Sequence, residues 1–406
     1  MNRKGFWISL CVINLSIVAF LGFALRSKIL FSMPFIDYRH LLSAHSHFAF
    51  GGWVGQSIIT LLIYNLLPSE QAGKKIYQQI LGTIAISSLG MAFFFPFMGY
   101  NIITIISSSL YIVAYFLFAP IFLKDLLRTQ QPKTIKLLSV AAILSLLISS
   151  LGPLGLSYIL FTHSGNSMLY RDSIYTFLHF QYNGFFTLSI FALLYQWLNK
   201  KGYSLKATDQ KFAVLLSLSV IPALFLSLLW HNNTIFYLLG IIGCVLILAS
   251  LYYFLRFSAQ IQWNSFFNHS LAKNLWLLAA FSFGLKMLLN VGTIYPALGN
   301  AIYGNRPVII GFLHLIFLGF VSFFLLSHFI ESGFFTRKGK LLRMPFMVFT
   351  LGVIGNEAFL MTQGLEILFK TNSTLYSWLL WGASIVLFTG ALFIAIARIK
   401  TARSLA

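Results

Sequence analysis

Charged residues are scarce in this sequence. Only 9% of its 406 residues are Asp, Glu, Lys or Arg, whereas soluble domains carry about a quarter. Apolar residues make up 58% of the chain and aromatic residues 17%. This composition excludes an ordinary soluble domain and predicts an integral membrane protein surrounded by a lipid bilayer.

Cysteine is equally rare. The chain holds only Cys11 and Cys244, both in apolar segments, so neither a disulfide nor a cysteine-based metal site is expected. The motif Cys-x-x-Cys-His does not occur, and we therefore expect no covalently attached c-type haem. The net charge of +20 would suggest nucleic acid in a soluble protein. Membrane topology accounts for it better, and no nucleic-acid partner is predicted.

Long apolar runs fill most of the chain. Because about 20 apolar residues cross a bilayer, the sequence predicts an all-α membrane protein with about twelve transmembrane helices in one polytopic domain, residues 1–406, without a convincing internal repeat. The expected spans are residues 5–26, 40–66, 76–98, 101–123, 135–160, 172–198, 212–230, 234–256, 273–295, 307–330, 345–369 and 375–397.

Lys and Arg are unevenly distributed over the connections between these spans. If the N-terminus is cytoplasmic, 21 of the 28 Lys and Arg residues fall on the cytoplasmic side and six on the other, while Lys286 lies within a span. Cytoplasmic loops are enriched in basic residues. The sequence therefore predicts cytoplasmic N- and C-termini in a bacterial-type inner (plasma) membrane.

Histidines occur in three spans at one depth. They are His45 and His47 in the second span, His179 in the sixth and His314 in the tenth. Each lies five to seven residues past the expected start of its span, which places it roughly 8–12 Å below the non-cytoplasmic helix ends. Ionisable residues inside a membrane are usually functional, although a buried histidine bonded to a carbonyl or hydroxyl is the alternative.

Neutral imidazole is a good ligand for haem iron and for copper. We therefore expect these spans to converge on a haem, with copper as a further possibility, and the candidate metal ligands are His45, His47, His179, His231 and His314. His45 and His47 are two residues apart, about 200° around a helix, so they cannot both face one cofactor. The sequence leaves open which of the two is the ligand.

The remaining histidines lie near the ends of spans. His40, His163 and His231 are expected at the non-cytoplasmic interface, where His231 ends the seventh span and is the most interesting as a ligand. His269 and His328 are expected at the cytoplasmic face and are most simply solvated.

A few other ionisable residues lie inside the spans. Lys286 has no acid near it in sequence, and Glu357 and Glu366 of the eleventh span are candidates to pair with it. The alternatives are a proton path or a polar lining, which Asn290, Asn356 and Gln363 would extend. Pairing is the favoured interpretation.

Three stretches resemble subunit I of the haem–copper oxidase superfamily, above all its cbb-type and nitric-oxide-reductase branches. Residues 48–52 resemble the segment after the low-spin haem histidine of helix 2, residues 179–186 the copper-histidine segment of helix 6, with the glycine one position off, and residues 311–321 the helix 10 segment. The opening of the second span, His45-x-His47 followed by Phe50-Gly51, is also similar to the NnrS family of haem- and copper-containing membrane proteins.

This resemblance implies a haem b held by His45 or His47 together with His314, with copper at His179 and His231 as an additional cofactor to consider. An electron donor or a partner subunit would supply electrons. The sequence departs from the family at Phe312, which falls where the oxygen-binding haem has its histidine, and at the seventh span, which offers His231 in place of a histidine pair.

Three functions follow as hypotheses. The first is a membrane protein with one bis-histidine, low-spin haem b that transfers electrons or responds to NO or O₂. The second is a respiratory terminal oxidase or a nitric oxide reductase, in which the missing ligands come from elsewhere and Glu357 or Lys286 carries protons. The third is a transporter or structural membrane protein in which histidines only join helices. Whether the protein is an enzyme stays open.

Overall fold

The structure is a computed structural model that describes residues 3–302, 305–335, 340–369, 371 and 373–404. Within these residues the chain is almost entirely helical and contains no strand. Among the described residues, twelve helices are long and apolar enough to cross a membrane. The predicted all-α bundle of twelve membrane-spanning helices is therefore confirmed.

Three of the twelve spans contain a π-helical segment. In chain order, the twelve spans are α1 (Arg3–Leu30), α2–η1–α3 (Tyr38–Phe48, Ala49–Gly55, Gln56–Leu66), α5 (Lys75–Met98), α6 (Ile102–Leu127), α7–α8 (Lys133–Ser149, Leu151–Thr162), α9–η2–α10 (Ser167–His179, Phe180–Phe186, Thr187–Lys200), α11 (Ala207–Leu224), α12 (Thr234–Ala259), α14 (Ser270–Gly292), α16–η5–α17 (Arg306–His314, Leu315–Ser322, Phe323–Glu331), α18 (Lys340–Leu368) and α19 (Leu375–Ser404).

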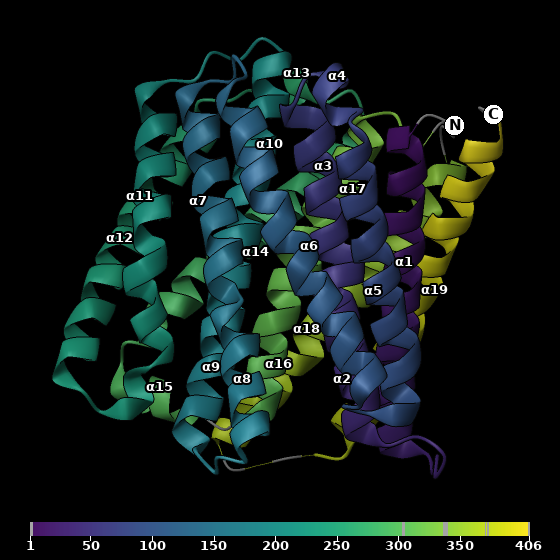
Figure 1. Ribbon diagram of the computed structural model, residues 1–406, viewed down its shortest axis with the longest axis vertical. Helices are drawn as coiled ribbons and strands as arrows, with labels where there is room; N and C mark the ends of the chain where they lie inside the picture. Colours follow the sequence, from purple (N-terminus) through teal and green to yellow (C-terminus); the bar gives the residue numbers. More distant parts are fainter. Residues whose placement is uncertain (1–2, 303–304, 336–339, 370, 372, 405–406) are drawn as a thin grey trace.

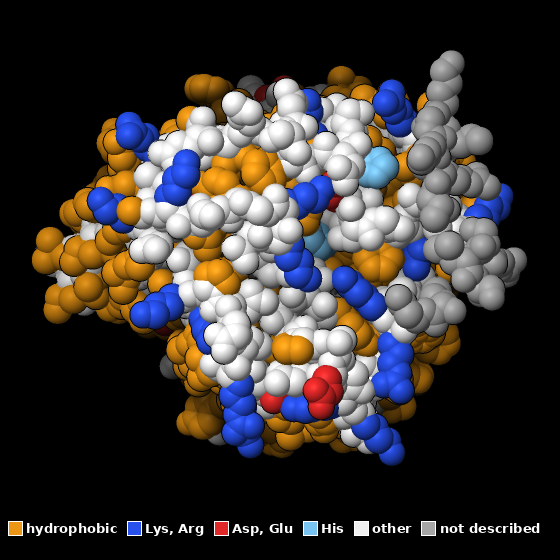
Figure 2. All heavy atoms as spheres, turned by 90° about the horizontal axis from the view of Figure 1, so that it is seen from above, with side chains coloured by type: hydrophobic (Ala, Val, Ile, Leu, Met, Phe, Trp, Pro, Cys, Tyr) orange, Lys and Arg blue, Asp and Glu red, His pale blue; other side chains and the backbone are white. Residues whose placement is uncertain are grey.

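Short helices lie in three of the connections: α4 (Ser69–Ala72), α13 (Trp263–Phe266) and α15 (Pro296–Ile302). Helix α19 packs along both α18 and α1, which brings the two ends of the chain to one face of the bundle (Figure 1). Lys and Arg side chains are spread over that face, and few Asp or Glu side chains are seen there (Figure 2). This is the face that the distribution of basic residues predicts to be cytoplasmic.

The second, sixth and tenth spans share a local structure. In each, the α-helix widens into a π-helical segment (η1, η2 and η5) that begins one or two residues after a histidine, namely His47, His179 or His314. Segments of π-helix are rare and frequently mark functional sites. Their recurrence every four spans is a repeat of structure that the sequence does not make obvious, because the three segments have little more than histidine and glycine in common.

A glycine lies five residues after each of these histidines and contacts the preceding span. A Cβ at Gly184 would come within 2.3 Å of Ser145 on α7, and a Cβ at Gly319 within 2.7 Å of Ser282 on α14. The carbonyl of Gly52 accepts a hydrogen bond of 2.6 Å from Asn14 on α1. The glycines allow two helices to approach closely, as is common in membrane bundles.

The second and tenth spans are joined directly at their π-helical segments. The indole N–H of Trp53 in η1 donates a hydrogen bond of 2.8 Å to the Ser322 hydroxyl in η5. The rings of Phe50 and Phe317 meet edge to face, 4.5 Å apart. These buried contacts fix the second span against the tenth, the two spans that carry His45 and His314.

Candidate functional site

His45 and His314 line the same cavity. It has a volume of about 210 Å³ and lies between α1, α2, η1, α16, η5, α18 and α19. Apolar side chains form most of its wall, and the polar exceptions include Arg26 and Asn356. Of the sequence-predicted ligands, this pair is the one that the structure brings together.

The two imidazoles are oriented in the same way. Nδ1 of His45 lies 3.1 Å from the Val18 carbonyl oxygen, and Nδ1 of His314 lies 2.8 Å from the carbonyl oxygen of Ile310. Because a carbonyl only accepts, each Nδ1 must carry the hydrogen and each Nε2 keeps a free lone pair. A histidine that ligates a metal is typically held in this manner. No described residue forms a hydrogen bond with either Nε2.

The start of α2 is set by Asp37. Its carboxylate accepts hydrogen bonds from the backbone N–H groups of His40 at 3.1 Å and Arg39 at 2.7 Å. These bonds hold the pKa of Asp37 below its usual value. An Asp N-cap fixes where a helix begins, and His45 lies about two turns further along α2.

Helix α1 supplies two residues to the cavity that the sequence gave no reason to single out. At Gly22 a Cβ would lie only 3.1 Å from Cε1 of His45, so the absent side chain leaves room for the imidazole. Arg26, one helical turn further on, also lines the cavity. No described residue forms an ion pair or a hydrogen bond with its guanidinium group. Gly22 and Arg26 are four residues apart and so lie on one face of α1. This spacing is the sequence feature that could have linked the two residues to each other.

His47 points elsewhere. Its Nδ1 donates to the Ser43 carbonyl at 2.8 Å, and its ring packs on Phe95 of α5, with ring centroids 4.8 Å apart. It does not line the cavity that His45 and His314 share. Between the two candidates that the sequence left open, the structure therefore places His45, and not His47, beside His314.

His179 has both ring nitrogens in hydrogen bonds. Nε2 donates to the Val220 carbonyl oxygen at 2.7 Å, and Nδ1 accepts from the Asn183 amide at 3.0 Å, while the side chain is fully buried. His231 is instead 3.0 Å from Asp172. Among the described residues, no group of three or more His, Cys, Asp or Glu side chains is arranged to hold a metal ion. These residues therefore do not form a ready copper site.

Two expectations about single residues are wrong. His328 is buried rather than solvated, and its Nε2 accepts a hydrogen bond of 2.9 Å from the amide of Asn65 on α3. Lys286 does not pair with Glu357 or Glu366, because its ammonium group donates to the Thr187 hydroxyl at 3.0 Å.

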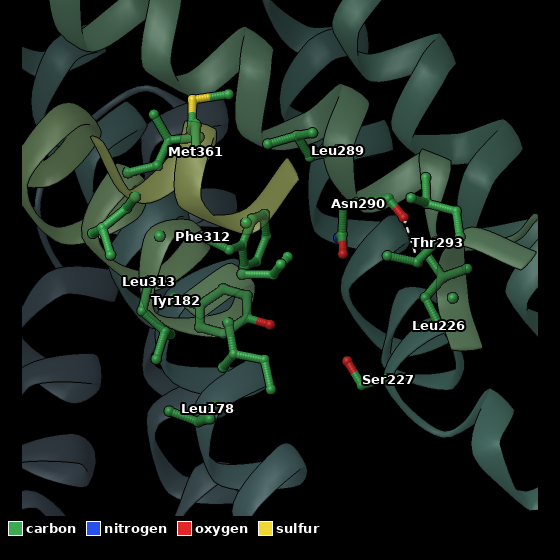
Figure 3. A pocket seen from close by; sticks show the side chains of 18 of the residues that line it. Leu178, Tyr182, Leu226, Ser227, Leu289, Asn290, Thr293, Phe312, Leu313 and Met361 are labelled. Carbon is green, nitrogen blue, oxygen red and sulfur yellow. Dashed lines mark hydrogen bonds between the residues drawn. The ribbon is translucent and has the colours of Figure 1, made fainter. Parts of the chain in front are cut away.

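A second cavity, of about 270 Å³, lies on the other side of α16. Phe312 lines it, two residues before His314, together with Tyr182 of η2 and Asn290 of α14 (Figure 3). Glu357 of α18 also lines it. Histidine is not among the described residues that line it. The two cavities therefore have different chemistry, although they share a helix.

No protein-family profile matches the chain, and no curated protein is similar to it in sequence.

Proposed function

We propose that this chain is an integral membrane haem protein in which His45 and His314 are the two axial ligands of one haem b, and that the protein transfers electrons. The observation that carries the proposal is the geometry of these two side chains. They line one cavity, and in each the Nδ1 atom is fixed by a backbone carbonyl while Nε2 has no described partner.

Two histidine ligands leave no open position on the iron. The bound haem would supply a one-electron couple, and electron transfer, rather than reduction of O₂ or NO, is the work suited to a six-coordinate iron. The contribution of the chain is to hold both rings in place and to surround the cofactor with apolar side chains, which keep water away. A response to NO or O₂ at the same haem would require one histidine to leave the iron.

Arg26 also supports the proposal, because its positive charge suits the negatively charged propionates of a haem. A haem b carries two propionate carboxylates, and a partly buried arginine without a protein partner suits them as a charge-assisted hydrogen-bond donor. Arg26 is such a residue and lines the same cavity as both histidines. Arg26 lies near the C-terminal end of α1, where its guanidinium group would be available to bind a propionate of a bound haem.

Copper has no part in this proposal. Both nitrogens of His179 are already bonded, and His231 pairs with Asp172. Phenylalanine at position 312 cannot ligate iron, so nothing specific favours a second haem that reduces a gas. The oxidase and reductase hypotheses therefore rank below electron transfer.

The location of the protein follows from the distribution of charge. We place the face rich in Lys and Arg, which carries both chain ends, on the cytoplasmic side of a bacterial-type plasma membrane. A one-electron carrier also needs a donor and an acceptor. The protein is therefore expected to dock an electron donor or a partner subunit.

The proposal is tested by the reduced-minus-oxidised optical spectrum of the purified protein, recorded with and without carbon monoxide. A sharp low-spin signal that carbon monoxide leaves unchanged is expected. A shift on adding carbon monoxide would reveal an open iron position and favour a gas-binding function. A protein without haem would leave only the helical bundle and overturn the assignment.

Replacement of a ligand identifies the site. His314→Ala and His45→Ala should each lower haem content by more than the roughly tenfold to hundredfold effect that outer-shell changes have at metal sites. His47→Ala is the matched control, because His47 lies on the same helix and outside the cavity. Equal loss in all three variants would point to misfolding, and no loss in any of them would refute the ligand pair.

A further inference from the structure

The second cavity has an entrance on the outer surface of the bundle. Leu289 of α14 and Met361 and Leu365 of α18 line it, and these side chains are 37%, 42% and 53% exposed. Met361 and Leu365 continue an exposed apolar stripe on α18 that includes Leu351 and Ile354. In a membrane that stripe faces lipid. The cavity is therefore accessible to a molecule dissolved in the bilayer.

Two polar side chains in the wall of this cavity each have one buried atom without a described hydrogen-bond partner. Asn290 is 6% exposed, and its amide Nδ2 is buried without a described partner. In Glu357, Oε1 accepts from the Asn356 amide at 3.1 Å, whereas Oε2 is buried without a described partner. Buried polar groups are normally satisfied, and one that is not calls for an explanation, such as a ligand.

Two further polar side chains point into the same space. The hydroxyl of Tyr182 and the side chain of Ser227 are directed into the space that Asn290 faces (Figure 3). The rings of Tyr182 and Phe312 meet edge to face, with centroids 5.8 Å apart, and both line the wall. The cavity thus combines aromatic walls with several hydrogen-bonding groups.

The charges of the lining restrict the ligand. None of the described residues that line the cavity is Lys or Arg, so an anionic headgroup would have no counter-charge there. A fatty acid would also bring its carboxylate close to Glu357. The ligand must therefore have a neutral head that can both accept a hydrogen bond from Asn290 and donate one to Glu357.

We propose that this cavity binds a quinol with an apolar tail. Such a molecule has a flat ring that suits aromatic walls, an oxygen that can accept from Nδ2 of Asn290, and a hydroxyl that can donate to Oε2 of Glu357. Its apolar tail leaves through the opening between α14 and α18 into the lipid. The proposal concerns binding alone and does not rest on the presence of haem.

The test is a binding titration of the full chain in lipid nanodiscs with a ten-carbon-tail benzoquinol, followed by tryptophan fluorescence or calorimetry. Asn290→Leu and Glu357→Leu should each weaken binding about tenfold or more, the effect of losing one good hydrogen bond. Glu366→Gln on the same helix is the matched control and should bind normally, because Glu366 bonds Tyr376 and does not line the cavity.

Two further measurements make the outcome decisive. Thermal unfolding of the ligand-free Asn290→Leu variant should show no loss of stability, because this change removes a buried amide whose Nδ2 has no described partner. Glu357→Leu should unfold at a somewhat lower temperature, because it also removes the acceptor of the Asn356 amide. Decanol, which has the tail without the ring, should bind much more weakly than the quinol. Equal binding of decanol, or quinol affinity unchanged in both leucine variants, would make the cavity a groove for lipid chains and overturn the proposal. Because His314→Ala should bind quinol normally, this result stands apart from the test of the haem.

Discussion

The two cavities on either side of α16 have opposite chemistry. His314 lines the first cavity and Phe312 the second. Positions two apart on a helix point about 200° apart, so one turn of α16 serves both. Helix α18 divides in the same way, because Asn356 lines the first cavity and Glu357 the second, and a hydrogen bond of 3.1 Å joins their side chains.

The difference shows how two cavities of unlike lining can share one pair of helices, α16 and α18. The first cavity has two imidazoles with a free Nε2 and an arginine without a described partner, which are the groups that a metal cofactor with carboxylates requires. The second has aromatic walls, an unpaired amide and an unpaired carboxyl oxygen, which can only make hydrogen bonds. Because two residues along α16 separate a side chain of one cavity from a side chain of the other, exchanging residues 312 and 314 should exchange these properties.

The largest expected effect comes from that exchange. A double variant, Phe312→His with His314→Phe, removes the tenth-span imidazole from the first cavity and should lower haem content more than tenfold, because phenylalanine cannot ligate iron. Haem is quantified as the pyridine complex per mole of purified protein.

Phe312→His alone is the control and should keep the original low-spin spectrum, because His314 is unchanged. If the double variant retained full haem content with an unaltered spectrum, His314 would not be a haem ligand. The proposed difference in function between the two cavities would then be wrong.

A smaller effect is expected at Gly22. Gly22→Ala would place a Cβ about 3.1 Å from Cε1 of His45, and the ring cannot retreat without stretching its bond to Val18. Overpacking of this kind costs about 1–3 kcal/mol, so haem should dissociate roughly five to a hundred times faster. Transfer of haem to a scavenging protein measures the rate.

Gly82→Ala is the control, because a Cβ at Gly82 would meet nothing within 4 Å. Equal rates of haem loss in both variants would contradict the assignment of His45.

Much of the fold could be predicted from the sequence, because length and hydropathy decide which segments cross a membrane. Counting residues along each span predicted a common depth for the histidines, and His45 and His314 do line one cavity. The choice between His45 and His47 could not be made in this way. It depends on how α2 is rotated about its axis, which is set by contacts such as the bond from Trp53 to Ser322, 269 residues away.

The incorrect expectations have the same origin. His328 was expected to be solvated because it lies near the end of a span, yet Asn65 of another span shields it and bonds to it. Lys286 was expected to form an ion pair with Glu357 or Glu366. Its ammonium group instead donates a hydrogen bond to the hydroxyl of Thr187, the first residue after η2. Neither partner is near in sequence, and a π-helical segment shifts the helical phase, so the pattern of 3.6 residues could not reveal them.

The smallest effect should arise at Arg26, where the haem is expected to stay bound but to change its reduction potential. A nearby positive charge favours the reduced haem, which carries one positive charge fewer than the oxidised form, so Arg26→Leu should lower the midpoint potential. At an effective dielectric constant of about 20 the shift should be roughly 50 mV, slightly less than a tenfold change in the one-electron equilibrium. Arg26→Lys should restore most of it, and Arg39→Leu, which removes an exposed charge near the same face, should have little effect because solvent screens it. A redox titration followed at the haem absorbance decides the matter: equal potentials in the wild type and in Arg26→Leu would mean that Arg26 does not face the cofactor, and the first cavity would differ from the second only in its histidines.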